Sequence, residues 1–98
     1  MTYNKKRTIV LIRKSAEKNI RRLPDYIIAS FKYWVSLVQL YGIYETKKIS
    51  VYHDEPLKGK RAGERSIRLS RSYRAIYIIS DSLEIEIVEV TEVNKHKY

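Results

Sequence analysis

The stretch RSIRLSRSYRAIYIISDSLEIEIVEV, residues 65–90, decides the fold of this chain of 98 residues. Within it, residues 65–70 alternate isoleucine and leucine with serine and arginine, as in a strand that buries one face. Residues 73–79 and 83–90 are rich in β-branched residues and are separated by the turn-forming residues 80–82 (SDS). We therefore expect three strands that follow one another in a meander.

Upstream of this stretch, the sequence indicates one more strand and two helices. Residues 8–13 (TIVLIR) form a short β-branched run, typical of a strand that is buried on both sides. Ser15 can cap a short helix that Pro24 ends. From Pro24 to Tyr41 apolar residues recur every three or four positions, which predicts a second helix that stops at Gly42.

Residues 43–64 lie between these helices and the meander and show no clear period. They contain Pro56, Gly59 and Gly63 among charged residues, so we expect a long basic loop with room for a brief helix at its start. The resulting order, β-α-α-β-β-β, predicts an α+β fold in which two N-terminal helices pack on one face of an antiparallel sheet. A chain of this length builds one core, so residues 1–98 are expected to form a single domain.

Charge is the strongest compositional signal. Twenty Lys and Arg residues against eleven Asp and Glu residues give a formal net charge of +9 and an isoelectric point near 9.8. Residues 58–74 hold seven of the basic residues and one acid, whereas residues 81–92 hold five acids and no base. A positive region of this kind attracts polyanions, above all nucleic acid. The alternative is a solvated basic surface that has no specific ligand.

Composition also argues against several classes of protein. The chain has no cysteine, which removes disulfides and thiolate ligands and fits a reducing cytoplasm. No apolar run approaches the roughly 20 residues of a membrane-spanning helix, and no secretory hydrophobic segment follows Met1. Two histidines without cysteine or clustered carboxylates give no ligand set for a metal. We expect a cytoplasmic protein with no metal, no other cofactor and no membrane partner.

Two arginines of the first predicted hairpin need a physical reason. If its loop consists of residues 70–72 (SRS), Arg68 lies directly opposite Arg74, and like charges in that position destabilise a sheet. A phosphate bound between the two guanidinium groups would offset this repulsion. Two structural alternatives remain open: neutralisation by Glu84 or Glu86 of the next strand, or a two-residue turn that sends the arginines to opposite faces.

The last predicted strand is followed by a short polar tail that ends in NKHKY, residues 94–98. A histidine side chain ordinarily titrates near neutral pH, so His96 is a candidate for proton transfer, and Tyr98 can stack on an unpaired base. A lone histidine or a terminal tyrosine is more often without such a role, but both residues follow the strand that neighbours Arg74. The other histidine, His53, lies in the basic loop.

The stretch PLKGKRAGERSIRLSRSYRAIY, residues 56–77, resembles the central signature of the RelE/ParE toxin superfamily, and most closely that of its RelE-like and HigB-like members. The ending VNKHKY resembles the short polar C-termini of those nucleases. The first half of the chain is similar only in the order of its elements. HigB-like relatives have a histidine directly before the proline of the P-L-K-G motif, whereas Glu55 stands there in this chain and His53 lies two residues earlier.

The resemblance implies the toxin of a type II toxin–antitoxin pair with the RelE-like fold of microbial ribonuclease toxins. Such toxins enter the ribosomal A site and cleave mRNA without a metal ion, by attack of a ribose 2′-hydroxyl on the adjacent phosphate. The implied partners are a cognate antitoxin protein, mRNA and ribosomal RNA. A ParE-like poison of DNA gyrase is the alternative, and a nucleic-acid-binding protein without activity is a third. His96 and Tyr98 favour cleavage, because gyrase poisons of this family usually lack such a tail.

Carried over to this sequence, the family's site residues fall on the basic block and the tail. Arg68 and Arg74 would clamp the phosphate, and His96 would transfer a proton. Tyr98 would orient the base or the 2′-hydroxyl. The positions expected to bind phosphates of the RNA are Lys58, Lys60, Arg61, Arg65 and Lys95. The resemblance leaves open which residue is the general base and which the general acid.

Overall fold

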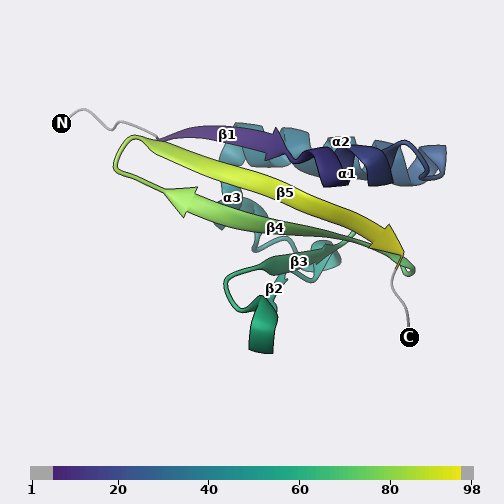
Figure 1. The fold of residues 1–98 in the computed structure, drawn as a ribbon. Helices are drawn as coiled ribbons and strands as arrows, with labels where there is room; N and C mark the ends of the chain where they lie inside the picture. Colours follow the sequence, from purple (N-terminus) through teal and green to yellow (C-terminus); the bar gives the residue numbers. More distant parts are fainter. Residues whose placement is uncertain (1–5, 96–98) are drawn as a thin grey trace.

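The computed structural model describes residues 6–95, in which five strands form one sheet in the order β1-β5-β4-β3-β2. The strands are β1 (Arg7–Ile12), β2 (Glu55–Pro56), β3 (Arg65–Arg68), β4 (Tyr73–Asp81) and β5 (Ile85–Lys95). The helices are α1 (Lys14–Ile20), α2 (Asp25–Tyr41) and α3 (Ile43–Thr46), with 3-10 turns η1 (Ser50–Tyr52) and η2 (Gly59–Arg61). The α+β class and the expected order of elements are confirmed, with α3 as the brief helix expected after Gly42 and β2 as an addition (Figure 1).

The sheet is mixed, which corrects the expectation of an antiparallel sheet. β3, β4 and β5 form the predicted antiparallel meander. β1, however, pairs in parallel with β5, from Arg7 opposite Ile85 to Ile12 opposite Val90. Parallel pairing requires a long crossover, and here the chain between β1 and the meander includes the helices α1 and α2.

The N-terminal segment differs from its prediction at two points. β1 is an edge strand and is not buried on both sides, since Leu11 is 48% exposed and Ile12 37% exposed. Ser15 does not cap α1, whose N-cap is Arg13. The Ser15 hydroxyl instead donates a 2.7 Å hydrogen bond to the carbonyl of Thr91 in β5. This bond ties the start of α1 to the end of the sheet.

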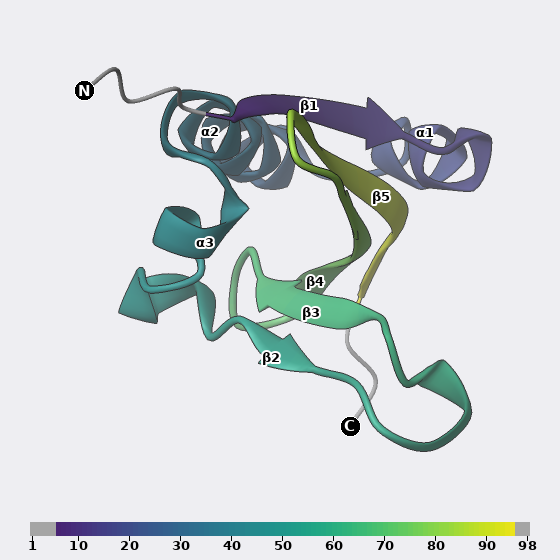
Figure 2. The same ribbon diagram turned by 90° about the vertical axis from the view of Figure 1, so that its left-hand side faces the viewer.

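Helix α2 covers one face of the sheet, and Figure 2 shows it on the same side as α3. Four residues of the predicted stripe are at most 2% exposed: Ile27, Phe31, Trp34 and Val38. The ring centroid of Trp34 lies 5.4 Å from that of Tyr77, and this contact joins α2 to β4. Tyr41, which the stripe also included, is 57% exposed because α2 ends there and the chain turns away. The core therefore lies between α2 and the sheet.

Residues 43–64, predicted to form a long loop, contain more secondary structure than expected. Gly42 ends α2 as expected, with a φ of +82° that favours glycine. α3 follows at once as the brief helix, and its Ile43 N–H donates a 2.8 Å hydrogen bond to the buried carboxylate of Glu86. β2 then pairs with β3 and carries the chain to the edge of the sheet. Within residues 6–95, no helix combines the length and apolar character that crossing a bilayer requires.

Candidate active site

The hairpin of β3 and β4 brings the two predicted arginines together. The N–H of Leu69 donates a 2.9 Å hydrogen bond to the carbonyl of Tyr73, so the loop consists of residues 70–72, as expected. Arg68 is therefore directly opposite Arg74 in the antiparallel register. Directly opposite side chains share a face of the sheet, which excludes the two-residue turn that would separate the arginines.

The arginines lie on the face of the sheet that points away from the helices. Ile67 and Ala75, the residues next to them in β3 and β4, belong to the core cluster that includes Trp34 of α2. Because side chains alternate along a strand, Arg68 and Arg74 point to the other side. We call this surface the arginine face, and its members are Glu55, Ser66, Arg68 and Arg74.

Arg74 has two polar contacts on the arginine face. Its Nη1 donates a 3.0 Å hydrogen bond to Ser66 Oγ and lies 3.4 Å from Oε1 of Glu55. The carboxylate beside Arg74 is thus Glu55 and not Glu84 or Glu86, the acids expected as alternatives. The Arg74 side chain is 20% exposed. A guanidinium carries five N–H donors, so Arg74 is held in place and keeps donors for an anion.

Glu55 is a candidate site residue that the sequence alone did not single out. β2 pairs Glu55 with Ser66, and this pairing brings its carboxylate to Arg74. The Glu55 side chain is 60% exposed. An accessible carboxylate beside guanidinium groups can accept a proton from a substrate hydroxyl. The available signal was its position directly before Pro56 of the P-L-K-G motif, where HigB-like relatives have a histidine.

Arg65, three residues before Arg68, lies on the other face of β3. Its Nε donates a 2.7 Å hydrogen bond to Asp54, whose side chain is 1% exposed, and the Tyr77 hydroxyl donates to the second carboxylate oxygen. Burial raises the pKa of the Tyr77 phenol, and the hydrogen bond to Asp54 raises it further. Burial lowers the pKa of Arg65, but its hydrogen bond to Asp54 contributes to a net rise. Arg65 is therefore engaged in an internal ion pair, away from the arginine face.

The segment between β2 and β3 carries three more of the predicted phosphate-binding residues. Lys58 and Lys60 are exposed there. Arg61 forms ion pairs of 2.9 Å with Glu64 and with Glu92 of β5. The hydrogen bond from Arg61 lowers the pKa of the Glu64 carboxyl. The lysines are thus accessible to an anion, whereas the charge of Arg61 is partly neutralised.

The remaining predicted residues belong to the C-terminal end of the chain. Lys95 ends β5 and pairs with Tyr73, the residue before Arg74. Because side chains alternate along a strand, Lys95 and Tyr73 lie on the other face of the sheet from Arg68 and Arg74. His96 and Tyr98 lie outside the described residues. Their roles in proton transfer and base orientation stay predictions.

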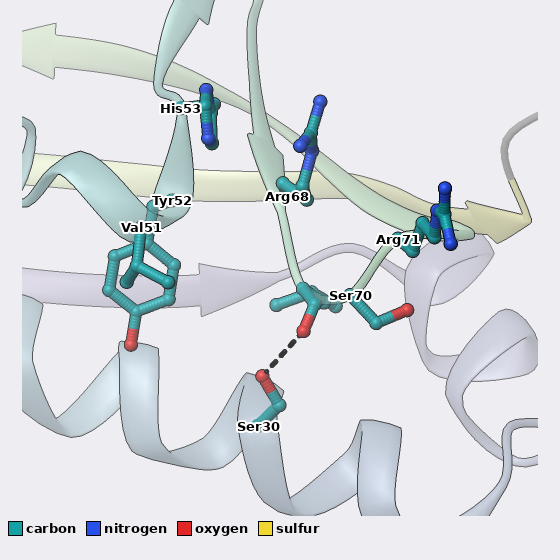
Figure 3. A pocket seen from close by; sticks show the side chains of 8 residues that line it. Ser30, Val51, Tyr52, His53, Arg68, Ser70 and Arg71 are labelled. Carbon is teal, nitrogen blue, oxygen red and sulfur yellow. Dashed lines mark hydrogen bonds between the residues drawn. The ribbon is translucent and has the colours of Figure 1, made fainter.

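A pocket of about 380 Å³ opens beside Arg68 at the edge of β3. It is lined by Ser30 of α2, by residues 51–53 and by residues 68–71. Figure 3 shows the side chains of His53 and Arg68 directed to the same side, away from α2. His53 has a φ of +45°, in the left-handed region. The fold thus places His53 next to a predicted site arginine, although the two are far apart in the sequence.

Solved structures with the same fold identify the architecture as that of the RelE-like toxins, which confirms the expected fold. The YoeB/ParE toxin from Agrobacterium tumefaciens matches with a TM-score of 0.71 and 21% identity, over 90% of this chain and 98% of that one. YafQ from E. coli matches with a TM-score of 0.73 and 15% identity, over 91% of this chain and 93% of that one. The RelBE2 toxin–antitoxin complex from Mycobacterium tuberculosis matches with a TM-score of 0.61 and 24% identity, over 89% of this chain and 95% of that one. No protein-family model and no curated protein sequence matches the chain.

Proposed function

We propose that this protein is the toxin of a type II toxin–antitoxin pair and that it cleaves mRNA as a metal-independent endoribonuclease. One observation carries the proposal: Arg68 and Arg74 lie directly opposite each other on the face that is not covered by the helices. The net charge of +9 supports a polyanionic substrate. The fold is shared with RelBE2 and with DinJ–YafQ, each described as a toxin–antitoxin complex.

The arginine pair is suited to a scissile phosphate. Two like charges directly opposite in a sheet destabilise it by roughly 0.2–1 kcal/mol, and a bound anion removes that penalty. Guanidinium groups bind phosphate oxygens through paired N–H donors. During cleavage, negative charge grows on the oxygens around phosphorus. Fixed cations at Arg68 and Arg74 stabilise that charge more than the charge of the ground state, which is the requirement for catalysis.

The proposed reaction is an internal transfer of the phosphodiester. Glu55 takes the proton of the ribose 2′-hydroxyl, and the 2′-oxygen attacks the adjacent phosphorus. The bond from phosphorus to the 5′-oxygen breaks, and a general acid protonates that oxygen. The products are a 2′,3′-cyclic phosphate and a free 5′-hydroxyl. We assign the base to Glu55 because its exposed carboxylate lies beside Arg74. For His96 as the acid and Tyr98 as the base-orienting residue, we follow the resemblance.

The RNA backbone would extend from the arginine face along the segment between β2 and β3. We retain Lys58, Lys60 and Arg61 as contacts to flanking phosphates. Arg65 is assigned to the fold instead, because its guanidinium is bound to the buried Asp54. Lys95 is left out because it is turned to the opposite face. The ribosomal A site in the cytoplasm and a cognate antitoxin remain the proposed setting and partner, again from the resemblance.

Primer extension on translated messages tests the proposal. Cells that produce the wild type should show new cuts with 5′-hydroxyl ends. Arg74→Ala should reduce cleavage by about 10²–10³-fold, and Glu55→Gln by about 10²–10⁴-fold. Arg7→Ala is the matched control, because it removes an exposed arginine from the far edge of the sheet. Equal cleavage by wild type and Arg74→Ala would dismiss the site. Gyrase–DNA adducts without RNA cuts would favour the gyrase poison.

A further inference from the structure

The pocket beside Arg68 has the size and lining of a site for a small flat group. At about 380 Å³ it falls within the range of about 300–1,000 Å³ typical of ligand pockets. Val51, Tyr52 and Leu69 supply apolar surface, and Val51 is 68% exposed. The polar lining consists of His53, of the arginines Arg68 and Arg71, and of the serines Ser30 and Ser70. An apolar wall with a few polar groups suits a heteroaromatic ring better than a bare anion.

Next to this pocket the edge of β3 has no strand pairing. β2 pairs with β3 only at Arg65 and Ser66, so among the described residues no strand covers the edge beside Arg68. The N–H of Leu69 points to β4, where it donates to Tyr73. Successive backbone N–H groups of a strand point to opposite edges, so the N–H of Arg68 points to the uncovered edge. Backbone groups at this edge can form hydrogen bonds with the polar edge of a base.

His53 is held at the rim of the pocket in a strained conformation. A φ of +45° is unfavourable in a residue other than glycine and persists where neighbours fix it. Tyr52 before it is 7% exposed, and Asp54 after it is bonded to Arg65 and Tyr77. The imidazole is therefore exposed while its backbone is anchored on both sides, and Figure 3 shows the ring on the same side as Arg68.

We propose that this pocket binds the base of one unpaired RNA nucleotide next to the scissile phosphate. The base would lie against the His53 ring and the apolar wall, with its polar edge toward the uncovered edge of β3. Unpaired bases are read in this manner, by stacking on histidine or guanidinium planes and by hydrogen bonds to their edges. Arg68 borders both the pocket and the arginine face, so one nucleotide can contact both. The inference rests on the proposed function and adds the part of the site that selects the sequence.

Cleavage of short single-stranded RNAs tests this inference, with one base beside the cut varied through all four. The wild-type kcat/KM should differ by about tenfold or more between the best and the worst base. His53→Asn keeps a residue that tolerates the left-handed conformation, and Val51→Trp fills the pocket from an exposed position. Both should reduce the spread to below about threefold while cleavage continues. Leu83→Trp, 95% exposed near the β4–β5 turn, is the control and should keep the preference.

A binding measurement separates failure of this inference from failure of the proposed function. Nuclear magnetic resonance titrations with AMP, GMP, CMP and UMP should shift the Val51 methyl and His53 imidazole signals, and leave the Leu83 methyls unchanged. Such shifts without any RNA cleavage would remove the nuclease and keep the base site. Cleavage with no shifts, and with an unchanged preference in His53→Asn and Val51→Trp, would remove the base site and keep the nuclease.

Discussion

The two faces of β3 use arginine in opposite ways. On the helix side, Arg65 lies 2.7 Å from Asp54, whose side chain is 1% exposed, so a buried anion matches the cation. On the other side, Arg68 faces a second cation, Arg74. Within residues 6–95 the guanidinium of Arg68 forms no ion pair. The first arrangement stabilises the fold from within. In the second, the acid beside Arg74 is the accessible Glu55, 3.4 Å away, and we propose that an external anion binds between the two arginines. Arg65 and Arg68, three positions apart, thus differ in role: the first stabilises the fold, and the second belongs to the proposed site.

Removal of Asp54 should strongly destabilise the fold, because it breaks the ion pair on the helix side of β3. Asp54→Ala leaves the Arg65 charge and the Tyr77 hydroxyl without their partner, and breaking a buried ion pair in this way costs about 3–5 kcal/mol. Urea unfolding followed by circular dichroism measures the loss. Adding Arg65→Met to Asp54→Ala should recover part of it. A loss below about 1 kcal/mol would show that the pair contributes little to the fold.

Removal of Arg68 should impair RNA cleavage without destabilising the fold. Arg68→Ala should reduce RNA cleavage by about 10²–10³-fold, because one of the two cations proposed to bind the phosphate is lost. Its free energy of unfolding should stay the same or rise by roughly 0.2–1 kcal/mol, because a like-charge repulsion is relieved. Arg65→Ala is the matched variant in the same strand and should be strongly destabilised. Equal destabilisation of the two variants would remove the distinction between the faces.

The sequence predicts the meander well and the placement of β1 poorly. Alternation in residues 65–70 and the loop at 70–72 are local signals, and they determine the register that brings Arg68 to Arg74. The β-branched run of β1 is equally compatible with a central strand and with an edge. Its parallel pairing with β5 depends on the path of the chain through the helices. No local sequence pattern predicts that path.

The site was predictable where it depends on register and not where it depends on the loop before it. The conformation of residues 50–55 decides that Asp54 reaches Arg65, that Glu55 reaches Arg74 and that His53 reaches the pocket. β2 has two residues, too few for any periodicity to be visible. The sequence pattern therefore could not distinguish Arg65, which has a buried acid as its partner, from Arg68, which does not.

Tyr77, whose hydroxyl donates a hydrogen bond to Asp54, makes the stability of the fold depend on pH. Tyr77→Phe removes a hydrogen bond to a charged group and should cost about 1.5–3 kcal/mol near neutral pH. The pKa of the Tyr77 phenol is raised in the fold, so its contribution is present below its ordinary pKa of about 10 and is lost as pH rises beyond that value. Urea unfolding of both proteins from pH 7 to pH 11 should show the two stability curves approaching each other at the alkaline end. A constant gap would contradict the raised pKa.

Arg61 is intermediate between Arg65 and Arg68, because it has acidic partners but these are accessible to solvent. Its side chain is 45% exposed and its partners Glu64 and Glu92 are also accessible, so Arg61→Ala should lower stability by less than about 1 kcal/mol, with the difference shrinking in high salt. The pKa of Glu64 is lowered by its hydrogen bond with Arg61, so its contribution is present above the ordinary carboxyl pKa and is lost as pH falls below it. Arg61→Ala should flatten that acidic part of the stability curve.

RNA binding offers a separate test of Arg61. If Arg61 also binds a phosphate, Arg61→Ala should reduce the slope of log K for RNA binding against log salt concentration by about 0.7–0.9. An unchanged slope would leave Arg61 as a surface ion pair alone.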